Sequence, residues 1–171
     1  TLKHGMSTSD NNRFLRQWFE VASGNLSVDS EDAAAANASG RRWFPFCKGG
    51  GARRWFGNAD YVVNWKDDGA EIKAETNRKY PYLKGNLGFV IGAEDYYFRE
   101  ATTWSSISSA AAAFRFLPTG FIICNKGQTL YPSDGISSDY LLGALNCTVV
   151  PLFLEALSPT IGYELGYVKQ I

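Results

Sequence analysis

Residues 41–65 read RRWFPFCKGGGARRWFGNADYVVNW, two apolar segments separated by a run of glycines and cations. The segment YVVNW (61–65) combines β-branched and aromatic side chains, which predicts a strand. The aromatic segment that begins at Trp43 predicts a second strand or extended piece before the glycines. After Trp65, KDDG predicts a turn, and AEIKAE would be the hairpin partner of the YVVNW strand.

The rest of the chain adds helices and further strands to this centre. Residues 11–21 fit a short helix or a strand, 27–40 a helix that ends at Gly40, and 76–92 a mixed loop. Strands are expected within 95–109, which ends in a polar turn, and around 114–117 and 120–124. Residues 138–157 predict a helix with Leu141, Leu142, Leu145, Val149, Leu152 and Phe153 on one face, kinked or broken at Pro151. With a final extended segment, the class is α+β: one domain (1–171), a mixed or mostly antiparallel sheet and a few helices.

The charges are balanced over the chain but unevenly distributed. The 171 residues are 45% hydrophobic and 15% aromatic, as expected of a globular domain, with 17 basic and 17 acidic side chains. Residues 33–59 contain no acid, and five cations fall in that window: Arg41, Arg42, Lys48, Arg53 and Arg54. A neutral protein with one basic segment is suited to an anionic partner on one face.

The cysteines and the chain ends bear on location. Cys47, Cys124 and Cys147 are too widely spaced for a disulfide framework or a zinc site, and His4 is the single histidine, so we expect no metal and reduced thiols in the cytoplasm. No apolar run approaches the ~20 residues of a membrane span, and the start is not a signal peptide. Because the chain begins without methionine, we expect it to be a piece of a longer protein.

The three glycines at 49–51 admit three interpretations: a flexible linker, a phosphate cradle for a nucleotide, or a loop that contacts nucleic acid. A Walker A loop needs lysine after its glycines, whereas Lys48 precedes them, and the Rossmann spacing is absent. Bare glycine amides beside Lys48, Arg53 and Arg54 still suit an anion. Four aromatic residues bracket the loop: Trp43, Phe44, Trp55 and Phe56. They suit contacts with bases, or else they form core below a solvated arginine face.

Two other segments carry candidate chemistry. Asp60, Glu71 and Lys73 imitate the D…E-x-K pattern of metal-dependent nucleases, although the same letters are common by chance. TTWSSISS (102–109) gathers hydroxyl groups around Trp104, which fits hydrogen bonds to DNA or a serine-rich turn over a buried tryptophan. No base accompanies a serine nucleophile, and the [DNS]-P-P-[YFW] tetrapeptide of amino-methyltransferases is absent. The sequence therefore contains no complete catalytic site.

Taken in order, five blocks resemble one family: GMSTSDNNRFLRQWFEV, RRWFPFCKGGGARRWFGNADYVVNWKDDGAEIK, YYFREATTWSSISS, FRFLPTGFIICNKG and YLLGALNCTVVPLFLEALSPTIGYELGYVKQI. They are similar to the C-terminal half of adenine-specific DNA methyltransferases of BREX phage-defence systems and related Type IIG restriction-modification enzymes. The most specific parts are K-G-G…R-[KR]-W-[YF]-G-N with Y-V-V-N-W after it, and T-W-S-x-I-S-S. The LLGALNCTVV helix also resembles target-recognition domains of Type I specificity subunits and TaqI-like methyltransferases.

The resemblance implies a parent enzyme that binds S-adenosylmethionine in a separate N-terminal Rossmann-like domain and methylates adenine N6. This chain would recognise the target in double-stranded DNA, without a cofactor of its own. The residues expected at the DNA are Lys48, Gly49, Gly50, Arg53, Arg54, Trp55, Asn58, Trp104, Ser105 and Ser108. The cations would contact phosphates or guanine edges, and the glycines would let the loop follow a groove. The alternatives are a nuclease that uses Asp60, Glu71 and Lys73, or a platform that docks other defence-system proteins or phage inhibitors.

Overall fold

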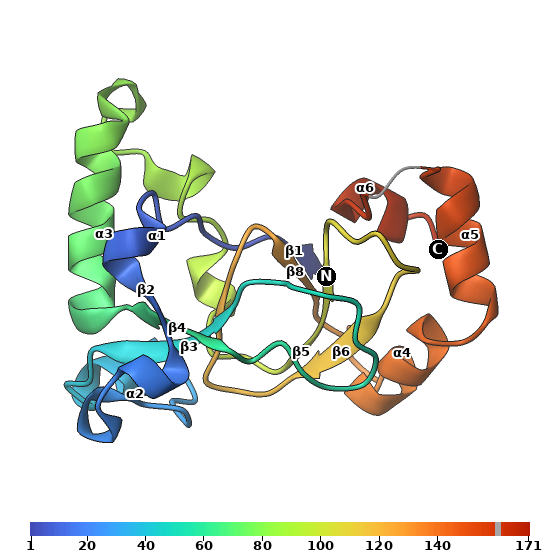
Figure 1. Ribbon diagram of the computed structural model, residues 1–171, viewed down its shortest axis with the longest axis horizontal. Helices are drawn as coiled ribbons and strands as arrows, with labels where there is room; N and C mark the ends of the chain where they lie inside the picture. Colours follow the sequence, from blue (N-terminus) through green and yellow to red (C-terminus); the bar gives the residue numbers. More distant parts are fainter. Residues whose placement is uncertain (160–161) are drawn as a thin grey trace.

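Two four-stranded β-sheets lie next to each other in the computed structural model of the chain, which describes residues 1–159 and 162–171 (Figure 1). Helices α1–α3 gather around one sheet, and α4–α6 lie beside the other. The predicted α+β class is confirmed, although the strands form two sheets where a single one was expected.

The first sheet has the strand order β1-β8-β5-β6 and is antiparallel throughout. Its strands are β1 (Leu2–Lys3), β5 (Ala101–Ser105), β6 (Phe114–Leu117) and β8 (Gly127–Leu130). The expected strands within 95–109 and at 114–117 are confirmed, whereas β8 was not predicted. In the register of this sheet, Thr103 of β5 lies opposite Arg115 of β6 and Thr129 of β8.

The second sheet has the order β2-β4-β3-β7. Its strands are β2 (Leu15–Gln17), β3 (Trp43–Cys47), β4 (Tyr61–Asn64) and β7 (Ile122–Ile123). The YVVNW strand is confirmed as β4, and it pairs antiparallel with both β2 and β3. Strand β7 joins β3 in parallel, so this sheet is mixed.

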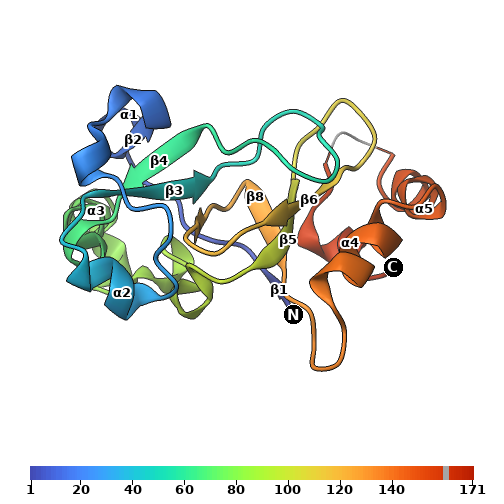
Figure 2. The ribbon, with the colours of Figure 1, turned by 90° about the horizontal axis from the view of Figure 1, so that it is seen from below.

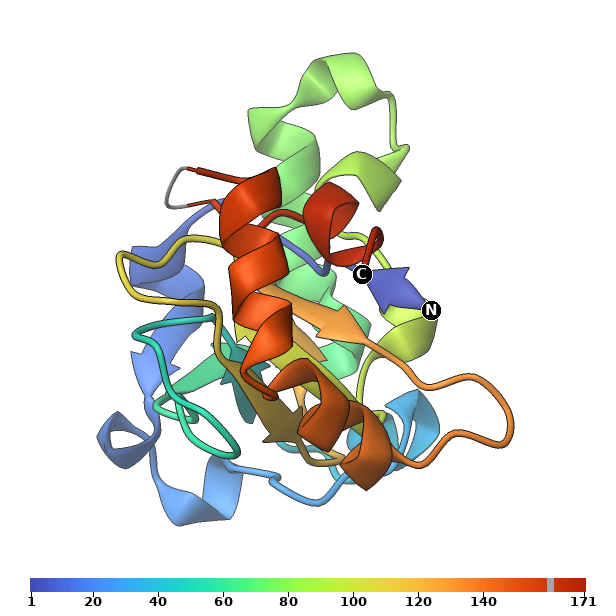
Figure 3. The same ribbon diagram turned by 90° about the vertical axis from the view of Figure 1, so that its right-hand side faces the viewer.

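Each sheet has its own apolar core. Buried side chains of the second sheet, α3 and the segment before β5 form the larger core, which includes Phe44, Phe46, Val63, Trp65, Ile72, Phe98, Ile122 and Ile123. The smaller core lies between the first sheet and α4–α6, which cover it in Figure 3, and includes Trp104, Phe114, Leu142, Leu145, Leu154, Tyr163 and Val168.

A close backbone contact joins the two sheets. Cys47 ends β3 of the second sheet, and Gly127 begins β8 of the first. A Cβ on Gly127 would lie 2.1 Å from the carbonyl oxygen of Cys47, so only glycine fits there. The Cys47 Sγ lies 3.1 Å from the Thr103 Oγ1 of β5, which adds a polar contact between the sheets.

The expected hairpin partner AEIKAE is wrong, because this segment belongs to helix α3 (Lys66–Lys79). The chain turns sharply through Asp67, Asp68 and Gly69, whose φ angles of 52°, 55° and 70° are left-handed. It then enters a helix whose Ile72 is fully buried. Alanine, glutamate and lysine all favour helix, and this preference outweighs the hairpin signal of the turn.

The other N-terminal expectations hold in shortened form. The helix expected at 27–40 is α2 (Ala33–Ala38), where the Asp32 carboxylate accepts a hydrogen bond from the Ala35 amide at 2.7 Å. Residues 11–21 contain both predicted alternatives, α1 (Asn11–Phe14) and β2, followed by a 3₁₀ turn η1 (Trp18–Glu20). Further 3₁₀ turns are η2 (Ser23–Asn25), η3 (Pro81–Leu83), η4 (Leu87–Phe89) and η5 (Glu94–Tyr96).

The C-terminal region differs more from expectation. The break expected in 138–157 divides α4 (Ser138–Leu145) from α5 (Val149–Leu157), and Pro151 lies in the first turn of α5, where its missing N–H costs no helical bond. The expected common apolar face is wrong, since Leu152 and Phe153 are exposed. The final extended segment is wrong too, because α6 (Leu165–Val168) lies there.

Among the described helices none could cross a membrane alone. The pair α4 and α5 together have the length and composition of a membrane span, but the two helices are bent by 64° relative to each other.

The contact between Cys47 and Gly127 predicts a large difference between two glycine-to-alanine changes. Gly127→Ala should lower the free energy of unfolding by about 2 kcal/mol or more, because the new methyl overlaps a carbonyl oxygen. Gly143→Ala, in α4 with no atom within 4 Å of its Cβ position, should raise it by about 0.5–1 kcal/mol. Urea denaturation of both variants measures this, and equal effects would contradict the close approach.

Candidate nucleic-acid interface

The segment between β3 and β4, residues 48–60, forms a loop that crosses from one sheet to the other and is called the glycine loop below. Figure 2 shows it leaving β3, reaching toward β6 and returning to β4. The Trp55 amide donates to the Phe114 carbonyl at 3.0 Å, and the Phe116 amide donates to the Trp55 carbonyl at 2.8 Å. Because both ends enter strands of one sheet and its middle pairs with β6, the loop is not a slack linker.

Positive φ angles and close packing explain Gly49 and Gly50. Gly49 has a φ of +90°, and a Cβ on it would lie 2.8 Å from the Lys126 carbonyl oxygen. Gly50 has a φ of +118° and lies against the Asn58 side chain. The Asn58 amide donates to the Gly51 carbonyl at 2.8 Å, so this side chain holds the loop together. The expected base contact by Asn58 would use only its remaining polar capacity.

The cations of the glycine loop have no acidic partner within the described residues. Arg53 and Arg54 are exposed, and the Lys48 ammonium lies 4.5 Å from the centroid of the Tyr61 ring. In contrast, Arg42 of the same acid-free window pairs with Glu71 at 3.1 Å. The loop therefore carries positive charge that the described part of the chain does not neutralise.

The aromatic residues on the two sides of the glycines differ in exposure. Phe44 is buried in β3 and belongs to the core. Trp55 and Phe56 are 55% and 61% exposed, so they present apolar surface beside Arg53 and Arg54. Trp55 also has a φ of 75°, an unfavourable angle for a bulky residue.

The first part of the second expected contact segment, residues 102–106, is buried. Trp104 is 1% exposed, and its Nε1 donates to the Tyr163 carbonyl at 2.8 Å. Ser105 is also buried, and its hydroxyl accepts from Arg115 Nη2 at 3.3 Å. Ser108 is partly exposed, and its neighbours Ile107 and Ser109 are exposed. Because β5 lies inside its sheet with both faces covered, Trp104 and Ser105 offer no contact surface to DNA in this conformation.

The nuclease pattern is not assembled. Asp60 lies directly before β4, whereas Glu71 lies in α3, beyond the other end of that strand. Glu71 pairs with Arg42, while the Lys73 ammonium lies 2.6 Å from Asp68 and 2.7 Å from Glu94. Among the described residues, no three His, Cys, Asp or Glu side chains are grouped to hold a metal ion.

Two cations near the loop were missed by the sequence analysis. Lys126 is exposed in the turn before β8, and its carbonyl, which lies below Gly49, accepts from the Ser106 amide at 3.1 Å. Arg115 is 1% exposed in β6, and burial lowers the pKa of its guanidinium. A charged residue in the apolar strand FRFL was the available signal for Arg115.

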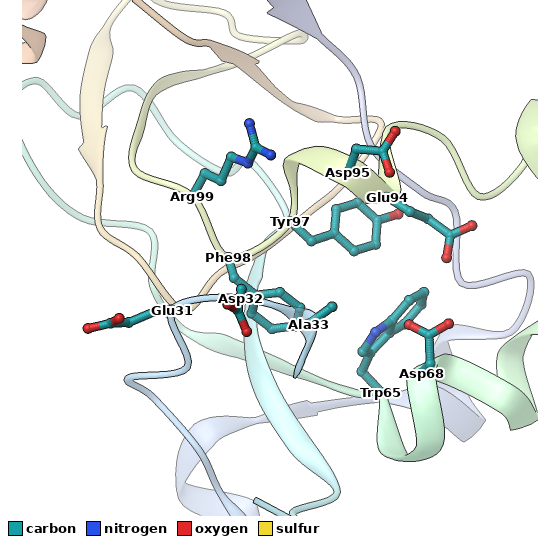
Figure 4. A pocket seen from close by; sticks show the side chains of 10 residues that line it. All are labelled: Glu31, Asp32, Ala33, Trp65, Asp68, Glu94, Asp95, Tyr97, Phe98 and Arg99. Carbon is teal, nitrogen blue, oxygen red and sulfur yellow. The ribbon is translucent and has the colours of Figure 1, made fainter. Parts of the chain in front are cut away.

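A cavity of about 510 Å³ lies away from the loop, between α2, α3 and η5 (Figure 4). Figure 4 shows carboxylates from three segments around the aromatic rings of Trp65, Tyr97 and Phe98. Its lining residues are Glu31, Asp32, Ala33, Trp65, Asp68, Glu94, Asp95, Tyr97, Phe98 and Arg99. This acidic lining would repel a polyanion, so the two regions differ in the charge of the partner they suit.

A basic, glycine-rich loop with exposed aromatic rings on an α+β scaffold is the type of surface with which proteins contact nucleic acid. The chain is 37% identical over 170 residues to the adenine-specific methyltransferase PglX of Lacticaseibacillus casei (strain Zhang), which is 99% of this chain and 14% of that protein. It is 31% identical over 159 residues to the adenine-specific methyltransferase BrxX of Escherichia coli O9:H4 (strain HS), 92% of this chain and 12% of that protein. No family model matches the chain. It is thus similar, over nearly its whole length, to a small part of two such methyltransferases.

The left-handed backbone at Trp55 predicts that glycine is more stabilising than alanine at this position, the reverse of their usual order. Trp55→Gly and Trp55→Ala both remove the exposed indole, but only glycine adopts a φ of 75° without strain. The glycine variant should therefore be the more stable by about 1 kcal/mol. Chemical denaturation of the pair tests this, and an alanine variant of equal or greater stability would contradict the conformation.

Proposed function

We propose that residues 1–171 form a DNA-contacting, target-recognition segment of an adenine-specific DNA methyltransferase that acts in phage defence. Double-stranded DNA would lie against the glycine loop. The observation that carries this proposal is the group of un-neutralised cations, Lys48, Arg53 and Arg54, beside exposed aromatic rings on one loop. The similarity to two adenine-specific methyltransferases supports DNA as the anionic partner.

Each part of the loop has a separate role in this proposal. The two exposed arginines and Lys48 would bind phosphate oxygens and so provide most of the affinity, which is electrostatic in DNA binding. Trp55 and Phe56, which are more than half exposed, would contact sugars or base edges. Asn58, bonded to Gly51, would keep the loop in shape. Trp104 and Ser105 would support the sheet below it.

Methyl transfer would take place outside residues 1–171. The triple glycine follows β3 but opens onto an irregular loop and not onto a helix, so it does not fit a Rossmann-type cofactor site. The parent enzyme would bind S-adenosylmethionine in another domain of the same chain and would work in the cytoplasm. Other defence-system proteins would be further partners, and the exposed apolar side of α5, with Leu152 and Phe153, would be one surface for them.

Removal of the two loop arginines from the full natural chain should weaken DNA binding in a salt-dependent way. Arg53→Ala with Arg54→Ala should raise the Kd for duplex DNA by tenfold or more, because two phosphate contacts are lost. The slope of log K against log salt should fall by roughly 1–2, since each phosphate contact contributes about 0.9. Fluorescence anisotropy over a salt series measures both quantities.

The matched control removes two exposed arginines outside the glycine loop. Arg78 pairs with Glu75 on α3, and Arg99 lines the acidic cavity. Arg78→Ala with Arg99→Ala changes the net charge equally, so it should leave the salt slope nearly unchanged. Equal weakening by both double variants would mean that overall charge matters and that the loop does not; no weakening by the Arg53/Arg54 variant would refute the proposal.

A further inference from the structure

The guanidinium of Arg115 is buried without a counter-charge. The side chain is 1% exposed, and its single hydrogen bond in the described part of the chain runs from Nη2 to the Ser105 hydroxyl at 3.3 Å. Its Nε and Nη1 have no partner there. An arginine in this state is rare, because a buried charge is strongly unfavourable unless it is paired.

The groups close to the guanidinium do not supply the missing negative charge. The two that act on it electrostatically are the Cys47 thiol and the Arg53 guanidinium. Burial raises the pKa of Cys47 to about 11, so this thiol is neutral near pH 7. Arg53 carries a like charge and repels it. The site therefore has two hydrogen-bond donors of Arg115 without an acceptor and an excess of positive charge.

The glycine loop is the cover over this guanidinium. Arg115 lies opposite Thr103 in the register of the sheet, on the same face as Ser105. The Ser105 hydroxyl lies 3.6 Å from the position of a Cβ on Gly49, so the loop passes directly above it. Trp55 of the loop pairs with β6 at Arg115 itself.

Few contacts attach the glycine loop to β6. The loop is joined to β6 by the two backbone hydrogen bonds of Trp55, while the Trp55 and Phe56 rings lie largely in solvent. Glycines with positive φ at 49, 50 and 57 lie on both sides of this attachment. The loop can therefore separate from β6 without the loss of any buried aromatic side chain.

We propose that Arg115 is a concealed phosphate contact, which the glycine loop uncovers when it lifts from β6 on binding of duplex DNA. This inference rests on the proposed function and deepens it by naming a buried contact residue. A phosphodiester oxygen is the ligand, because it brings the negative charge that the buried guanidinium lacks, whereas a base edge offers only neutral acceptors. Nε and Nη1 are the free donors that would meet it.

Arg115→Met in the full natural chain tests the proposal, since methionine fills similar apolar space without charge. We expect an unchanged or raised Tm in the absence of DNA, because an unpaired buried charge is removed. We also expect a roughly tenfold higher Kd for duplex DNA and a salt slope smaller by about 0.9. Arg115→Lys keeps the charge and should keep the slope. Arg78→Met, at an exposed arginine on α3, is the control and should change neither.

Hydrogen exchange of the wild-type protein gives an answer that does not depend on how the variants fold. The amides of Trp55 and Phe116 make the bonds that close the loop on β6, so they should exchange faster when DNA is bound. Increased protection of both amides would overturn the proposal, as would a lowered Tm with an unchanged salt slope for Arg115→Met.

The outcomes separate this inference from the proposed function. If the wild-type chain does not bind DNA, or if the Arg53/Arg54 variant binds normally, both fall together. If the Arg53/Arg54 variant is weakened while Arg115→Met keeps its affinity and salt slope, the glycine loop still faces DNA but Arg115 is not a contact.

Discussion

The structure depends on the close approach of two backbones, at Cys47 and Gly127, where the last residue of β3 meets the first residue of β8. A side chain on Gly127 would overlap the Cys47 carbonyl, and this contact fixes how the two sheets lie against each other. The glycine loop begins at the next residue, so its start is set by a very close contact between two backbones. Its middle pairs with β6 of the first sheet. A loop between two strands of one sheet thus becomes a bridge over both.

The net charge of the chain is zero, but acidic and basic side chains are concentrated in different regions. Several acids of α3 and its surroundings are paired with cations, such as Glu75 with Arg78, and Asp68 and Glu94 with Lys73. The glycine loop has the opposite balance, with cations that have no acidic partner in the described residues and a buried Arg115 beneath them. Such unpaired charge lowers stability unless a partner supplies the missing anion, and strain at Trp55 adds to the same local cost. Strain and unpaired charge in the same loop support the proposal that it is a functional site.

Local sequence patterns were sufficient for some elements and insufficient for others. Strands β4 and β6 could be predicted because their β-branched and aromatic residues act through neighbours in the sequence. Helix α3 could not be predicted, because a strand followed by the turn KDDG is also the pattern of a β-hairpin. Trp104 was misplaced because its burial depends on β8 and on Tyr163, far along the chain. The unpaired cations of the loop could be predicted from the lack of acids in residues 33–59. Arg115 could not, because its burial depends on a loop far from it in the sequence.

The most direct test of the account is a photochemical map of where DNA touches the chain. Duplex DNA with photoreactive bases would be cross-linked to the full natural protein, and the attached peptides would be identified by mass spectrometry. We expect cross-links within residues 1–171 to concentrate in the glycine loop, above all at Trp55 and Phe56, with the turn at Lys126 as a second site. Cross-links confined to α5 or to the acidic cavity beside α3 would contradict it.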